Sequence, residues 1–160
     1  MKQTALAKLG GSSKTTSEHA AMLVLDTNHI TALGYSGPLS DRLRQRLAGA
    51  NQDTATTIIT VEEQLRGWLS EVRKLTDPHD QIFAYSELQK RVTLFAAWIV
   101  LPWDVESAKI FVRLRKLLPR TGTLDLKIAS ICLAHDAVLL TRNLSDFRQV
   151  PGLRVENWID

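Results

Sequence analysis

The feature that most constrains the fold is a short apolar run, residues 22–25, that stops at the carboxylate of Asp26. The run has the length of a buried strand, and the small polar residues Thr27 and Asn28 are typical of the turn into a helix. In open α/β sheets, ligands bind beyond the carboxyl ends of the strands, which makes Asp26 a candidate functional residue. An isolated Asp at this position more often caps the following helix. The interpretation therefore depends on whether other acids occupy equivalent places.

Short apolar runs alternate with helical patterns along the rest of the chain. Further strands are predicted at residues 56–60, 98–101 and 137–141, with a short edge strand at residues 153–158. A long helix is predicted to begin at Asp77-Pro78, with one apolar face formed by Ile82, Tyr85, Leu88, Val92 and Phe95. This alternation predicts an α/β fold with a mainly parallel sheet that helices cover on both faces.

Length and composition indicate one folded domain. The chain has 160 residues, of which 44% are hydrophobic and 23% charged, as in ordinary globular proteins. No apolar run is long enough to cross a membrane. Residues 1–21 are polar and are expected to form a flexible extension before a domain at residues 22–160. The only cysteine, Cys132, excludes an intramolecular disulfide, which fits a cytoplasmic protein.

The net charge of +3 does not by itself indicate a nucleic-acid-binding protein. Residues 1–21 contain three lysines and one glutamate, which leaves 17 basic and 16 acidic residues in the remainder. A phosphate-containing partner would therefore have to be bound by local clusters of cations and by a metal ion.

Three more acids occupy positions equivalent to that of Asp26, next to predicted strand ends or helix starts. Glu63 follows the second predicted strand, Asp125 lies in the first turn of a predicted Thr-capped helix at residues 122–134, and Asp146 follows the fourth strand. Each acid has a structural explanation, since carboxylates stabilise helix N-termini and Thr60 with Glu63 matches a capping box.

Four carboxylates at one sheet edge, without matching lysines or arginines, would repel one another. A hard divalent cation held by carboxylate oxygens and water compensates such repulsion. The bound cation can activate a water molecule and stabilise the leaving oxygen, which is the chemistry of phosphodiester hydrolysis. The sequence therefore predicts a metal site formed by Asp26, Glu63, Asp125 and Asp146.

Other chemistries have weaker support. The four histidines have no cysteine or histidine at zinc-ligand spacing, so surface or loop roles are expected for His19, His29, His79 and His135. Cys132 is expected to be a buried core residue, and the sequence contains neither a glycine-rich phosphate loop nor a Gly-x-Ser-x-Gly motif.

Four segments together resemble the PIN domain, and specifically the VapC-type toxins of bacterial toxin–antitoxin pairs. They are Leu25-Asp26-Thr27-Asn28, residues 60–67, residues 122–134, and Thr141-Arg142-Asn143 with Asp146-Phe147. The resemblance covers residues 22 to about 158. It implies that Asp26, Glu63 and Asp125 correspond to the first three acids of the family, with Asp146 or Asn143 at the fourth position. It also implies that Thr27, Asn28, Thr141 and Asn143 orient these carboxylates.

Membership of this family implies a Mg²⁺- or Mn²⁺-dependent endoribonuclease that acts in the cytoplasm on RNA loops such as those of tRNA or rRNA. It also implies a homodimer and inhibition by a cognate VapB-like antitoxin. Two alternatives remain open, a non-catalytic PIN-like interaction module and a PIN nuclease of RNA maturation. Apolar residues on the predicted helices between residues 60 and 95 are candidates for a partner surface: Trp68, Ile82, Phe83, Tyr85 and Phe95.

Overall fold

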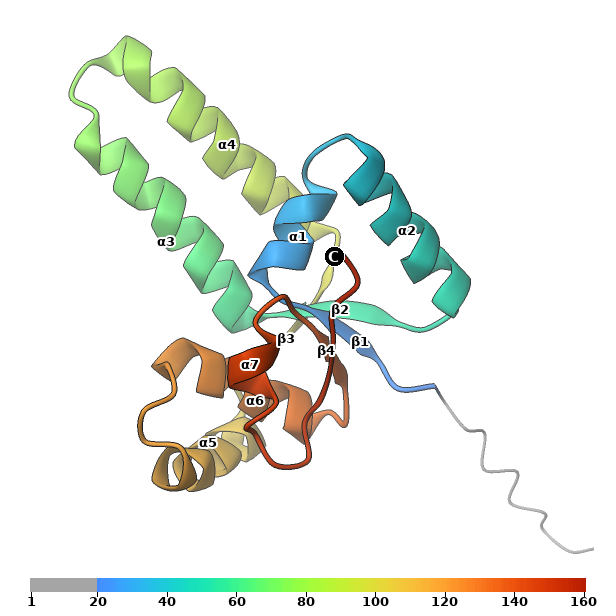
Figure 1. Ribbon diagram of the computed structural model, residues 1–160. Coiled ribbons are helices and arrows are strands. Elements are labelled where there is room, and N and C mark those ends of the chain that lie inside the picture. Colours follow the sequence, from blue (N-terminus) through green and yellow to red (C-terminus); the bar gives the residue numbers. More distant parts are fainter. Residues whose placement is uncertain (1–19) are drawn as a thin grey trace, which may run out of the picture.

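The computed structural model describes residues 20–160, and most of the predicted N-terminal extension lies outside the described residues. In chain order the elements are β1 (Leu23–Leu25), α1 (Thr27–Leu33), α2 (Pro38–Ala50), β2 (Thr54–Thr57), α3 (Ile58–Lys74), α4 (Pro78–Ala96), β3 (Ile99–Leu101), α5 (Val105–Leu117), α6 (Thr123–Ala134), β4 (Val138–Leu140), α7 (Leu144–Phe147) and β5 (Arg154–Glu156). The predicted α/β alternation is confirmed (Figure 1).

The five strands form one parallel sheet in the order β3-β2-β1-β4-β5. β1 lies at the centre; the chain adds β2 and β3 on one side of it, then returns to add β4 and β5 on the other. The order therefore reverses between β1 and β4, and such a reversal leaves a crevice at the carboxyl ends of the strands. The residues that follow β1, β2 and β4 all belong to this edge of the sheet.

Alternate residues of the central strands pack on opposite faces of the sheet. Val24 and Leu139 belong to a core that includes residues of α5, α6 and α7, whereas Leu23 and Leu25 belong to one with residues of α1 and α2. Side chains alternate between faces because successive Cβ atoms of a strand point in opposite directions. The prediction that helices cover both faces is confirmed.

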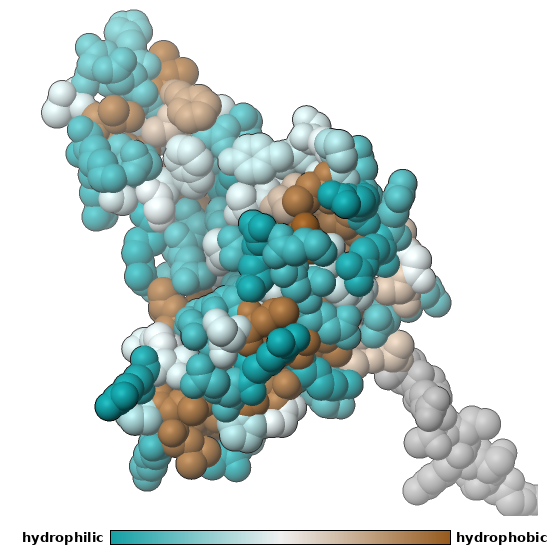
Figure 2. Space-filling model, in the orientation of Figure 1, coloured by the Kyte–Doolittle hydropathy of each residue, from teal (hydrophilic) through white to brown (hydrophobic). Residues whose placement is uncertain are grey.

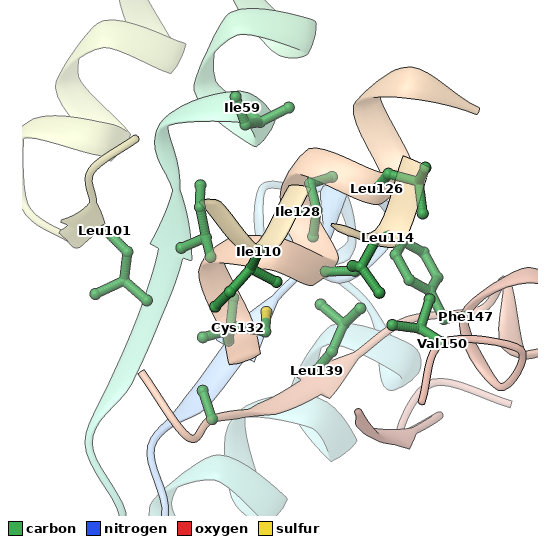
Figure 3. Packing of buried hydrophobic residues seen from close by; sticks show 14 of the residues in the cluster. Ile59, Leu101, Ile110, Leu114, Leu126, Ile128, Cys132, Leu139, Phe147 and Val150 are labelled. Carbon is green, nitrogen blue, oxygen red and sulfur yellow. The ribbon is translucent and has the colours of Figure 1, made fainter. Parts of the chain in front are cut away.

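The larger core lies between the sheet and α6, with α5 behind it (Figure 3). α6 is apolar around most of its circumference and is buried, as such helices normally are. Its Cys132 is fully buried, which confirms the prediction of a core residue. α6 is thus held firmly on the sheet, and its N-terminus, which carries Asp125, reaches the carboxyl edge.

The second strand ends earlier than the sequence predicts. Residues 58–60 form the first turn of α3, because the Thr57 hydroxyl caps that helix by accepting the amide N–H of Thr60 at 3.1 Å. The β-branched Ile58 and Ile59 resemble strand residues in sequence, but the cap decides their conformation. The predicted capping box of Thr60 with Glu63 is therefore wrong, because Thr60 lies inside the helix.

α3 and α4 form an antiparallel arm that extends away from the sheet (Figure 1). The start of α4 at Asp77-Pro78 is confirmed, with the Asp77 carboxylate accepting the backbone N–H of His79 and Asp80. Its predicted apolar face is wrong, since of those five residues only Phe95 is buried, whereas Ile82, Tyr85 and Val92 are exposed.

The buried side of α4 is partly charged. It contains Ala84, Glu87, Arg91 and Phe95. The guanidinium of Arg91 pairs with Glu87 and donates to the side-chain oxygen of Gln64 at 3.2 Å, and the Gln64 amide donates to Thr31 at 3.0 Å. Buried polar groups are tolerated when they are hydrogen-bonded in this way. The network joins α4, α3 and α1, which fixes the base of the arm beside the carboxyl edge of the sheet.

No helix in residues 20–160 is long and apolar enough to cross a membrane.

Leu114 and Leu117 on α5 test the position of the core. Leu114 is 5% exposed and Leu117 is 65% exposed. We expect Leu114→Ala to lower the free energy of unfolding by about 3 kcal/mol, since it removes buried methyl groups and leaves a cavity. Leu117→Ala should change it by less than about 0.5 kcal/mol. Urea denaturation followed by circular dichroism measures both, and similar losses in the two variants would contradict the packing described here.

Candidate active site

Asp26 lies at the centre of the carboxyl edge of the sheet, directly after β1, and is 7% exposed. One carboxylate oxygen accepts the Thr27 backbone N–H at 2.6 Å, which caps α1, and the other accepts the Thr141 hydroxyl at 2.9 Å. Burial raises the pKa of Asp26, while the hydrogen bonds from Thr27 and Thr141 oppose that rise. The capping interpretation of Asp26 is thus correct, and it leaves the same carboxylate beside the other acids.

Glu63 lies on α3 and faces Asp26. Its Oε2 atom accepts the hydroxyl of Thr27 at 2.7 Å, so Thr27 holds both carboxylates through its N–H and its O–H. Partial burial raises the pKa of Glu63, and the charges of Asp26 and Asp125 raise it further. The neighbouring Glu62 instead points outward and pairs with Arg66. The resemblance assigns the second acid to Glu63, whose spacing to Gly67 fits the family, and in the structure it is Glu63 rather than Glu62 that lies beside Asp26.

Asp125 lies in the first turn of α6, as predicted. Burial raises its pKa, and the charges of Asp26 and Asp146 add to the rise. The predicted threonine cap is wrong: the residue before the helix is Gly122, and no side chain caps this end. The Asp125 carboxylate folds back over Gly122, where a Cβ atom would lie 3.1 Å from its Oδ2 atom. A glycine at this position therefore leaves room for the carboxylate.

Asp146 and Asn143, the two candidates for the fourth position, are hydrogen-bonded to each other. The Asn143 amide donates to Asp146 Oδ2 at 2.9 Å, and its backbone N–H donates to the Thr141 hydroxyl oxygen at 3.1 Å. Thr141 thus connects Asn143 to Asp26. The buried ring of Phe147 anchors the short helix α7 that carries Asp146.

Three of the four predicted orienting residues, Thr27, Thr141 and Asn143, hydrogen-bond to the candidate carboxylates. Asn28 is exposed, and in the described part of the chain its side chain makes no hydrogen bond. The roles of all eight residues in metal binding stay predictions.

The carboxylates repel one another and lack cationic partners. Within residues 20–160, none of Asp26, Glu63, Asp125 and Asp146 forms an ion pair. The charges of Asp26 and Asp125 raise the pKa of Glu63, and the charges of Asp26 and Asp146 raise the pKa of Asp125. Their oxygen atoms, with those of Asn143, are the donors that Mg²⁺ and Mn²⁺ prefer. Over the same residues, no three His, Cys, Asp or Glu side chains lie close enough together to hold a metal ion. The fit to a hard cation therefore rests on the chemistry of the oxygen donors.

His29 was expected at the surface or in a loop, but it is fully buried on the inner side of α1. Its Nε2 atom accepts the backbone N–H of Trp158 at 3.2 Å, and burial lowers its pKa to about 4. The spacing of His29, Ile30 and Leu33 on one helical face could have indicated burial. His29 therefore ties the C-terminal segment to α1 as a neutral side chain. His79 and His135 are exposed, and His19 lies outside the described residues.

Glu63 gives a test of this electrostatic arrangement. Its pKa is raised above the ordinary value of 4.5, so ionised Glu63 destabilises the folded state as pH rises through the folded pKa. In EDTA, we expect Glu63→Gln to be more stable than the parent at pH 7, with the difference shrinking toward about pH 4, where Glu63 is protonated in both states. Urea denaturation at both pH values measures this.

Glu62→Gln is the matched control, because its exposed pair with Arg66 contributes little. A larger gain in stability at neutral pH in Glu62→Gln than in Glu63→Gln would contradict the placement of Glu63.

The chain is similar to a known protein family and to several proteins of known structure or activity. A family model described as the PIN domain matches residues 23–153. Ribonuclease VapC2 of Rickettsia felis is 29% identical over 75 residues, which make up 44% of this chain and 56% of that protein. The tRNA(fMet)-specific endonuclease VapC of Salmonella typhimurium is 35% identical over 63 residues, or 37% of this chain and 48% of that protein. The chain thus spans about half the length of the curated relatives it matches.

A similar solved structure is that of VapBC2 from Rickettsia felis bound to a DNA fragment from their promoter. It aligns with a TM-score of 0.65 and 25% identity, covering 86% of this chain and 98% of that chain. PIN nucleases are typically metal-dependent. The family model covers most of the chain, and the parallel α/β fold agrees with it; the chain belongs to the PIN-domain family.

Proposed function

We propose that the chain is a divalent-metal-dependent endoribonuclease and the toxin of a bacterial toxin–antitoxin pair, acting in the cytoplasm. The observation that carries the proposal is the set of four carboxylates at the sheet edge, none of which has an ion-pair partner in residues 20–160. The charges of neighbouring carboxylates raise the pKa values of Glu63 and Asp125. The similarity to a VapC ribonuclease and to a VapC tRNA endonuclease supports the same activity.

Asp26, Glu63 and Asp125 would hold Mg²⁺ or Mn²⁺, with Asp146 or its partner Asn143 at the fourth position. When bound, such a cation activates water and stabilises the leaving oxygen of a phosphodiester. Thr27 keeps Asp26 and Glu63 in fixed relative positions, since it donates to both. Orienting groups of this kind typically change metal affinity or activity about 10- to 100-fold.

The proposed substrate is RNA with an accessible single-stranded loop, as in tRNA or rRNA. Loops expose bases and backbone that a shallow site can reach, whereas a paired RNA helix does not. Residues 22–160 have almost balanced charge, so the cation and a few local side chains have to provide most of the attraction to phosphate.

Asp26→Asn and Asp125→Asn test the proposed reaction. We expect each to lower the rate of RNA cleavage by about 100-fold or more, since each removes a metal-binding carboxylate rather than a group that only orients one. Mapping of new RNA 5′ ends, with growth of the expressing bacteria, measures the effect against Glu62→Gln as a control with its site intact.

Cleavage by the Asp variants at the parental rate would refute the carboxylate mechanism. A folded parent that neither cleaves RNA nor binds Mn²⁺ would instead favour a non-catalytic PIN interaction module, in which Asp26 acts only as a helix cap.

A protein partner is the second part of the proposal. Ile82, Phe83 and Tyr85 on α4 are 64%, 65% and 53% exposed, and Trp68 packs edge-on against Phe83 at 6.1 Å. Figure 2 shows apolar side chains at the far end of the arm. Exposed apolar patches of this kind mark interaction surfaces. Because the chain resembles VapC-type toxins of toxin–antitoxin pairs, we propose that this face binds a cognate antitoxin. The same resemblance leads us to propose that the toxin is a homodimer.

Phe83→Lys tests the partner surface. A lysine placed at this position would introduce a charge that binding has to desolvate, so we expect the affinity for the co-expressed cognate antitoxin to fall at least about tenfold. Titration calorimetry measures the affinity, and light scattering measures the mass of the free toxin and of the complex.

Val112→Lys on α5, which is 54% exposed, is the control for an exposed apolar position outside the arm. Unchanged affinity and unchanged mass in Phe83→Lys would show that the arm is not the interface.

A further inference from the structure

The side chain of Arg115, near the end of α5, organises the loop that leads into α6. Its guanidinium donates to the backbone oxygens of Pro119 at 3.2 Å and Thr121 at 2.8 Å, and to the Thr123 hydroxyl at 2.9 Å. It also lies over the ring of Phe111, 5.5 Å from the centroid. A planar guanidinium can serve several acceptors at fixed angles, whereas a lysine ammonium cannot hold them in the same geometry.

These contacts lie on both sides of Gly122. Thr121 precedes this glycine and Thr123 follows it, and the Asp125 carboxylate lies directly over it. The N-terminus of α6 has no side-chain cap of its own, so its first turn depends on the preceding loop for support. Arg115 therefore fixes the conformation of the loop segment against which the Asp125 side chain packs.

The Phe111 ring, over which Arg115 lies, is linked to α6 through Trp103. The rings of Phe111 and Trp103 meet edge to face at 5.7 Å, and the ammonium of Lys127 on α6 lies 5.6 Å from the centre of the Trp103 ring. α5 and α6 are thus joined at their sides as well as through the loop. Because these contacts hold α6 against α5, a change in the loop conformation would alter the first turn of α6 and would leave the rest of the helix in place.

We propose that Arg115 is a positioning residue for Asp125: it sets the conformation of residues 119–123 and thereby holds the Asp125 carboxylate in the orientation that binds a divalent cation. This rests on the proposed metal-dependent function. Arg115 acts through the loop and touches none of the four carboxylates.

The experiment compares Arg115→Lys and Arg115→Met with the parent in the full chain. Titration calorimetry with Mn²⁺ alone measures cation binding. Hydrogen exchange in EDTA measures opening within residues 121–126 at the amides of Thr121 and Leu126, which donate to the backbone oxygens of Leu118 and Gly122. We expect both variants to weaken Mn²⁺ binding about tenfold, the scale expected of a group that orients a ligand. We also expect faster exchange confined to residues 121–126. In RNA cleavage, kcat should fall while KM changes less than twofold.

Two further variants separate geometry from charge and from folding. Lys109→Met removes an exposed positive charge from the same helix and should match the parent in both measurements. Gly122→Ala places a methyl group against the Asp125 carboxylate while leaving the acceptors of Arg115 in place, and should also weaken Mn²⁺ binding.

Parental Mn²⁺ affinity in Arg115→Lys would show that only charge matters and would overturn the proposal, as would unchanged exchange in both Arg115 variants. If the parent binds no Mn²⁺ and cleaves no RNA, the proposed function fails. The exchange measurement then still decides whether Arg115 orders the loop that precedes Asp125.

Discussion

The structure depends on the way a buried carboxylate, Asp26, is held at the centre of a parallel sheet among like charges. Burial raises the pKa of Asp26, and the charge of Asp26 in turn raises the pKa values of Glu63 and Asp125. Three hydrogen bonds offset part of the free-energy cost of burying these carboxylates. Thr27 donates one to Asp26 and one to Glu63, and Thr141 donates one to Asp26. Such an arrangement is unfavourable for a purely structural edge and favourable for a site that binds a cation.

The sheet topology explains why the acids meet. β1 is central, and the order of the strands reverses between it and β4, so residues that follow β1, β2 and β4 share one crevice. α6 brings the remaining acid to the same place by pointing its N-terminus at the crevice. The two halves of the site are supported differently. Glu63 accepts a hydrogen bond from Thr27 and is next to Gln64, which belongs to the partly buried network of Arg91, Gln64 and Thr31 at the base of the arm. Asp125 depends on the loop held by Arg115.

The arm and the site are connected through that buried network. Arg91 lies on α4, whose opposite side exposes Ile82, Phe83 and Tyr85, and the hydrogen bonds of Arg91 lead through Gln64 to α1. A partner bound to the arm would therefore contact α3, which carries Glu63, and α4, which is hydrogen-bonded to α3 through Arg91. The polar character of the inner side of α4 also explains why its apolar residues face outward. Few apolar side chains are buried between the two helices of the arm, and the remaining apolar side chains of α4 are exposed.

The sequence by itself determined the order of the elements, the parallel α/β class and the placement of Asp26, Glu63, Asp125 and Asp146 beside strand ends or helix starts. Those properties are local, since hydrophobic periodicity and strand length are encoded in neighbouring residues. Only the tertiary structure decided that Glu63 and Asp26 share Thr27 as a hydrogen-bond donor, because Thr27 lies 36 residues before Glu63 in the chain. It also decided that His29 and Arg91 are buried and that Arg115 supports a loop. Each of these outcomes depends on partners far away in the chain, namely Trp158 for His29 and Gln64 for Arg91, or on a loop conformation that no periodic pattern encodes.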